Sequence, residues 1–126
     1  MISIGFPVDD KQRSDIAKWL VENYDGVVRD GQIRHLPAGE YWEATYLDIE
    51  KDTYQNGAFW AVATTWFYDA IKEEYPELAE RCVFDALGYF EKNGVYECVC
   101  GEYKKLDTYV VSATSIYDAI KKINKL

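Results

Sequence analysis

The sequence is poor in cysteine, histidine and basic residues, and each shortage excludes a class of protein. Three cysteines cannot all pair within one chain, so we expect a reduced, cytosolic protein without a disulfide framework. His35 is the only histidine, and with Cys98 and Cys100 it is too little for a four-ligand zinc site. We therefore expect no metal and no cofactor. The alternative for Cys98 and Cys100 is structural, because they share one face of an extended segment and can pack under a helix.

Positive charge and long apolar runs are also scarce. The chain has 14 Lys and Arg against 22 Asp and Glu, a net charge of -8, and its basic residues are scattered. Since phosphate binding requires clustered cations, we expect no nucleic-acid partner. No apolar run reaches the length that spans a bilayer, and residues 1–7 lack the basic and apolar parts of a signal peptide. We expect no membrane partner and no export.

The remaining composition is that of a globular chain with helical periodicity. At 126 residues and 48% hydrophobic content it predicts a single domain, residues 1–126, with a modest core. Asp9 and Gln12 have capping-box spacing, Pro76 can begin a helix, and Gly94 can end one. Apolar residues at three- and four-residue intervals predict four helices, at about residues 10–25, 58–74, 76–93 and from Ser115 onward.

Between the first two predicted helices the periodicity changes. Val27–Arg29 and Gln32–Arg34 flank Asp30 and Gly31, a dipeptide that closes two-residue β-hairpins. The long segment that follows is rich in Tyr, Trp and carboxylates, which favours a functional loop. The predicted fold is therefore mainly α: about four helices as two antiparallel hairpins, with a small β-hairpin and extended loops at one end.

The stretch Thr53–Ala61 is the centre of this pattern. A polar turn containing Asn56 and Gly57 leads into a predicted helix whose first turn carries aromatic residues. A helix N-terminus presents unpaired backbone N–H groups, and the Gln55-Asn56 pair there, with Tyr54 and Trp60 beside it, suits a hydroxylated or anionic ligand. The alternative is that Asn56 is an N-cap and the aromatic residues belong to the core.

Three segments together carry a resemblance to a known family. Tyr54–Ala61 (Tyr-Gln-Asn-Gly-Ala-Phe-Trp-Ala), Gly94–Cys98 (Gly-Val-Tyr-Glu-Cys) and Tyr109–Thr114 (Tyr-Val-Val-Ser-Ala-Thr) resemble, in order and spacing, the closing part of the six-hairpin glycosidases. These (α/α)₆ toroid enzymes include trehalases, processing α-glucosidases and glycogen-debranching-type hydrolases. The resemblance covers about residues 27–116. The chain departs from the pattern at Val110 and Val111, where aromatic residues are common in the family.

The resemblance implies a carbohydrate-active module with a specific set of site residues. Glu97 would be the general base that activates water in an inverting hydrolysis. The residues implied to contact the sugar are Glu40, Trp42, Tyr54, Gln55, Asn56 and Trp60. Apart from the resemblance, Glu97 reads as one solvated carboxylate in an acidic chain.

Length limits what this chain can do alone. A toroid of this family has twelve helices and the sequence predicts about four, so the part that carries the catalytic acid is missing. We expect the isolated chain to be inactive, a C-terminal piece of an inverting glycosidase, with a non-catalytic helical oligomerisation or ligand-binding protein as the alternative. Bare apolar flanks would favour a homodimer, or association with the missing toroid segment.

Overall fold

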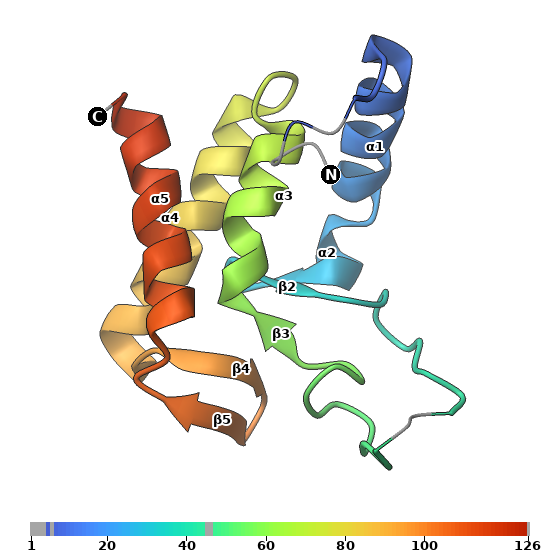
Figure 1. Ribbon diagram of the computed structural model, residues 1–126, viewed down its shortest axis with the longest axis vertical. Helices are drawn as coiled ribbons and strands as arrows, with labels where there is room; N and C mark the ends of the chain where they lie inside the picture. Colours follow the sequence, from blue (N-terminus) through green and yellow to red (C-terminus); the bar gives the residue numbers. More distant parts are fainter. Residues whose placement is uncertain (1–4, 6, 45–46, 126) are drawn as a thin grey trace.

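The computed structural model describes residues 5, 7–44 and 47–125 (Figure 1). Over these residues the chain forms five α-helices, one 3₁₀-helix and a five-stranded sheet. The helices are α1 (Asp10–Glu22), α2 (Tyr24–Val27), η2 (Ala61–Ala63, 3₁₀), α3 (Thr64–Ile71), α4 (Pro76–Asn93) and α5 (Val110–Asn124). The strands are β1 (Val28–Arg29), β2 (Gln32–Arg34), β3 (Phe59–Trp60), β4 (Tyr96–Cys100) and β5 (Tyr103–Asp107).

The predicted fold class, mainly α with two helical hairpins, is wrong. The structure is a mixed α/β domain, because the segments predicted as loops pair into one antiparallel sheet in the order β1-β2-β3-β4-β5. The key error lies at Phe59 and Trp60, which were predicted to begin a helix. They form β3 instead, and its partners are β2 and β4. Because these partners are distant in the sequence, a short apolar run carries no local signal that distinguishes a strand from a helix.

The predicted hairpin at Asp30 and Gly31 is confirmed. Val28 pairs with Ile33 and Arg29 pairs with Gln32, which leaves a two-residue turn with φ of 48° at Asp30 and 67° at Gly31. The turn is seated directly on α4. A Cβ atom added at Gly31 would stand 2.0 Å from the Cys82 carbonyl oxygen, so only glycine fits there.

Helices gather at one end of the molecule and strands at the other (Figure 1). α3 lies in the middle of the helices and packs against α1, α4 and α5. The buried core between them includes Phe67 and Ile71 of α3, Cys82 and Val83 of α4, and Ile116 of α5. The sheet end of the molecule therefore rests on a packed helical layer.

The helix limits predicted from local signals are correct at some ends and wrong at others. The Asp9–Gln12 capping box is present, and α4 begins at Pro76 and ends before Gly94 at a φ of 91°. The first helix is shorter than predicted, and the residues before β1 form α2. The last helix begins at Val110 rather than near Ser115.

The expected homodimer stays a prediction. If apolar flanks are bare, large aromatic residues should be exposed on the helices; Trp19 and Trp66 are exposed by 49% and 55%, whereas Trp60 and Phe67 are buried and Phe90 is partly buried. Among the described residues, no helix has both the length and the apolar content to cross a membrane.

Candidate functional site

A long loop, residues 35–58, connects β2 to β3 and is folded around Asn56. The Asn56 side chain is 3% exposed. Its Oδ1 accepts a hydrogen bond from the Trp42 backbone N–H, and its Nδ2 donates to the Ile49 carbonyl, both at 2.9 Å. One amide thus holds two distant parts of the loop, as buried asparagines often do. The side chain is occupied by the backbone, so its role in this structure is positional.

Arg34, a buried residue of β2, holds the same loop through Asp52. The Arg34 guanidinium lies 3.4 Å from the Asp52 carboxylate, whose Oδ1 also accepts a hydrogen bond of 2.9 Å from the Tyr41 hydroxyl. Gly57, with φ of 122°, allows the chain to pass close by, because a Cβ there would stand 2.6 Å from Arg34 Nη2. The sequence Asn56-Gly57 therefore positions the loop and the start of β3.

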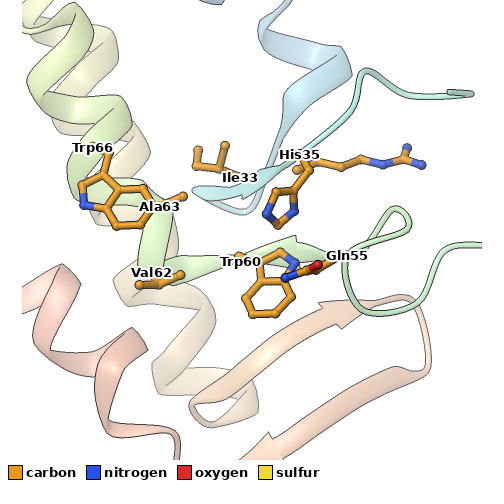
Figure 2. Close-up of a pocket in the computed structure, with 8 residues that line it drawn as sticks. Ile33, His35, Gln55, Trp60, Val62, Ala63 and Trp66 are labelled. Atoms are coloured by element: carbon orange, nitrogen blue, oxygen red, sulfur yellow. The ribbon is translucent and has the colours of Figure 1, made fainter. Parts of the chain in front are cut away.

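The two ends of the loop, the sheet, η2 and the start of α3 line an open cavity of about 300 Å³, which we call the tryptophan cavity (Figure 2). Trp66 of α3, exposed by 55%, and the largely buried Trp60 of β3, exposed by 7%, both line it, and His35 and Gln55 supply polar groups. Ile33, Arg34, Val62 and Ala63 complete the lining. The combination of indole rings with a few polar atoms is typical of small-molecule sites.

Packing against Trp60 favours the neutral form of His35. Its ring meets Trp60 edge to face, with centroids 5.6 Å apart and planes at 87°. Although part of the residue is open to solvent, this packing removes water from the imidazole, and burial lowers the pKa of His35 below its ordinary value of 6.5. A neutral imidazole has one donor and one acceptor nitrogen, so it can bond a hydroxyl group in either direction.

The residues that the resemblance implied to contact a sugar divide into four groups. Gln55 and Trp60 line the tryptophan cavity. Tyr54 packs behind Trp60, with ring centroids 5.0 Å apart, and Trp42 donates from Nε1 to the Gln55 carbonyl at 3.1 Å. Asn56 is positional, as described above. Glu40 lies in the loop, where its carbonyl accepts from Arg34 and its side chain faces solvent.

Glu97, the predicted general base, does not line the tryptophan cavity. It lies in β4, is 7% exposed, and its Oε2 atom has no hydrogen-bond partner among the described residues. Phe59 pairs with Val99, so strand alternation puts Cys98 on the face of Trp60 and Glu97 on the other face. Its charge still reaches Tyr54, where the negative charge on Glu97 raises the pKa of the hydroxyl.

Among the described residues, no Asp or Glu lines the cavity, whereas inverting hydrolysis requires two carboxyl groups around the scissile bond. The described lining therefore lacks the carboxyl pair that such a reaction uses. The described residues also contain no group of three or more His, Cys, Asp and Glu that could hold a metal ion.

Sequence reasoning missed His35 and Trp66 as site residues. His35 follows directly after β2, and a strand end beside a functional loop was a usable signal. Trp66 lies inside the single helix that the sequence predicts at about residues 58–74. Its place in the site depends on the chain turning from β3 into α3, which the predicted continuous helix did not contain.

Comparison with known protein families, with curated proteins and with solved structures finds no match to this chain. The resemblance to six-hairpin glycosidases therefore stays a hypothesis based on the sequence motifs.

Proposed function

We propose that the tryptophan cavity binds a sugar ring, and that this chain is a carbohydrate-binding module without glycosidase activity of its own. The observation that carries the proposal is the composition of the cavity, two indoles with a neutral imidazole and an amide. A pyranose has an apolar C–H face that stacks on indole and a rim of hydroxyls that exchange hydrogen bonds with such groups. The volume of about 300 Å³ is at the lower end for ligand sites, which favours one or two rings.

The absence of a lining carboxylate supports binding without turnover. Loss of general-acid assistance alone costs roughly 10²–10⁴-fold in rate. We expect the purified chain to release no product from an aryl glucoside or from trehalose. Turnover that disappears in Glu97→Gln would contradict this part of the proposal.

Binding can be measured through the four tryptophans, because each indole N–H gives one resolved NMR signal. We would titrate the protein with glucose, maltose and trehalose and follow these signals. Saturable shifts are expected for Trp60 and Trp66, which line the cavity, and none for Trp19 on α1.

Trp66→Ala and Trp19→Ala form a matched pair, since the two side chains are exposed by 55% and 49%. Both variants should stay folded. Trp66→Ala should weaken sugar binding roughly tenfold, the loss of one aromatic contact, and Trp19→Ala should leave it unchanged. Equal effects of the two variants, or no saturable shift with any of the three sugars, would refute the proposed site.

A further inference from the structure

A second cavity adjoins the tryptophan cavity, and the two have two lining residues in common. Val62 of η2 and Trp66 of α3 line both, and Figure 2 shows these two side chains at the end of the tryptophan cavity that lies away from Gln55. The second cavity has a volume of about 270 Å³, and we call it the α5 groove. Its other lining residues are Thr65 of α3 and Val111, Thr114, Ser115 and Asp118 of α5.

Trp66 is the aromatic residue that can contact a ligand in both cavities. It is 55% exposed, whereas Trp60 in the tryptophan cavity is 7% exposed. Each cavity alone has a volume near the lower limit for ligand sites, and the two together lie well inside that range. A ligand that fills both is therefore longer than the one or two rings that the tryptophan cavity holds, and it crosses the exposed indole of Trp66.

The hydroxyl groups on the α5 side of the groove have their protons bound to backbone. The Thr114 hydroxyl donates to the Val111 carbonyl at 3.1 Å, and the Ser115 hydroxyl donates to the Val62 carbonyl at 2.9 Å. Thr114 is exposed and Ser115 is partly exposed. A hydroxyl has one proton and two acceptor lone pairs, so both groups face a ligand as acceptors.

Asp118 adds a carboxylate that is held in position. Its Oδ2 atom lies 2.9 Å from Lys122 Nζ, and the same ammonium group binds the buried Asp69 at 2.7 Å. The Asp118 side chain is 55% exposed, and a carboxylate can accept about four hydrogen bonds, so acceptor sites remain for a ligand. The carboxylate and the two hydroxyls therefore suit a ligand that carries hydrogen-bond donors.

The charges near the groove favour donors without a charge. An anionic ligand would be repelled by Asp118 and by the net charge of -8. A cationic ligand would gain little from Asp118, because Lys122 already balances that carboxylate. Sugar hydroxyls are uncharged donors, and the same molecule has apolar C–H faces that can stack on Trp66.

We propose that the tryptophan cavity and the α5 groove form one continuous site for a neutral oligosaccharide of about three rings or more. This inference rests on the proposed function, because it extends the sugar site described above. One ring lies beside His35 and Gln55, the next stacks on Trp66, and a third donates hydroxyl protons to Asp118 and Thr114. One carboxylate does not supply the pair that inverting hydrolysis uses, so the longer site is also a binding site.

The test is an NMR titration with saccharides of increasing length. Glucose, maltose, maltotriose and maltotetraose form an α-linked series, and cellobiose, cellotriose and cellotetraose form a β-linked series. The Trp60 indole N–H reports on the tryptophan cavity, and the backbone amides of Thr114 and Ser115 report on the α5 groove. In one series the trisaccharide should bind roughly tenfold more tightly than the disaccharide and shift the Thr114 and Ser115 signals saturably, whereas glucose should shift only Trp60. Trigalacturonic acid, an anionic trisaccharide, should bind more weakly than the neutral one.

Asp118→Ala and Asp15→Ala form a matched pair. Each removes an exposed carboxylate that pairs with a lysine four residues away on the same helix, Lys122 and Lys11 respectively. Asp118→Ala should weaken trisaccharide binding roughly tenfold or more, because hydrogen bonds to a charged group are lost, and should leave glucose binding unchanged. Asp15→Ala on α1 should change neither affinity.

The outcomes distinguish this inference from the proposed function. If glucose or maltose shifts Trp60 saturably, but trisaccharides bind no more tightly and leave Thr114 unshifted, the continuous site is wrong and the sugar site stands. Unchanged trisaccharide affinity in Asp118→Ala, or tighter binding of trigalacturonic acid than of both neutral trisaccharides, would also overturn the continuous site. No saturable shift with any saccharide would refute both proposals.

Discussion

Substitution of Gly31 by alanine tests how firmly the β1–β2 turn is held on α4. The residue has a φ of 67°, where alanine is strained by roughly 1–2 kcal/mol. A Cβ atom would also stand 2.0 Å from the Cys82 carbonyl oxygen and 2.4 Å from the Ala86 nitrogen. Both are backbone atoms of a helix, so the turn itself must move away.

That movement adds two further costs. Forcing an extra carbon into a packed region costs roughly 1–3 kcal/mol, and loss of the 2.7 Å hydrogen bond from Thr64 to the Gly31 carbonyl costs about 1 kcal/mol. Gly31→Ala should therefore lower the free energy of unfolding by roughly 3–6 kcal/mol, a large part of the 5–15 kcal/mol typical of a domain.

Two other glycines provide matched controls for the same substitution. Gly101 has a φ of 56° but no atom within 4 Å of an added Cβ, so Gly101→Ala measures the backbone strain alone, roughly 1–2 kcal/mol. Gly88 lies inside α4 with equally open space, and Gly88→Ala should stabilise the protein by roughly 0.5–1 kcal/mol. Urea unfolding followed by circular dichroism measures all three. If Gly31→Ala destabilises no more than Gly101→Ala, the turn does not rest on α4 as the structure has it.

Three further predictions concern the loop and the thiols. Asn56→Ala should lower the free energy of unfolding by about 2–3 kcal/mol, because two buried hydrogen bonds are lost. Urea unfolding measures this change. If stability is unchanged and sugar binding is lost, Asn56 is a ligand contact instead. Burial raises the pKa of Cys82 and Cys98 to about 12 from an ordinary value of 9, so the folded state holds both protons longer than the unfolded state. The stabilisation that the two protonated thiols contribute is complete below pH 9 and is lost as the pH rises towards 12. This loss of stability should be smaller in Cys82→Ala. A urea midpoint that stays constant over that pH range would contradict the prediction. In the native protein at pH 8, iodoacetamide should modify the partly exposed Cys100 first.

Parts of the structure that depend on local signals were predictable. The turn at Asp30 and Gly31, the capping box at Asp9 and the limits of α4 each depend on residues within a few positions of one another. Strand β3 was not predictable in this way. Its two residues lie within a short apolar run that fits helix or strand, and the partners that decide between them are far along the chain.

In the candidate site, too, only the residues that are close in sequence could be placed together. Gln55 and Trp60 could be placed together because they are five residues apart, and both line the tryptophan cavity. The position of Glu97 relative to them depends on strand register, which no local pattern specifies. The implied general base therefore lies on the other sheet face from the cavity it was expected to serve.

The two-residue strand β3 places Trp60 at the tryptophan cavity and Phe59 on the other face of the sheet. Because side chains alternate along a strand, a slip of one residue would exchange these two rings and remove Trp60 from the cavity. The turn just before β3 opposes this slip, since Asn56 binds the loop backbone there and Gly57 fits closely against Arg34. The Asn-Gly pair that suggested a ligand contact in the sequence thus has a structural role, because its contacts hold the start of the strand that carries Trp60.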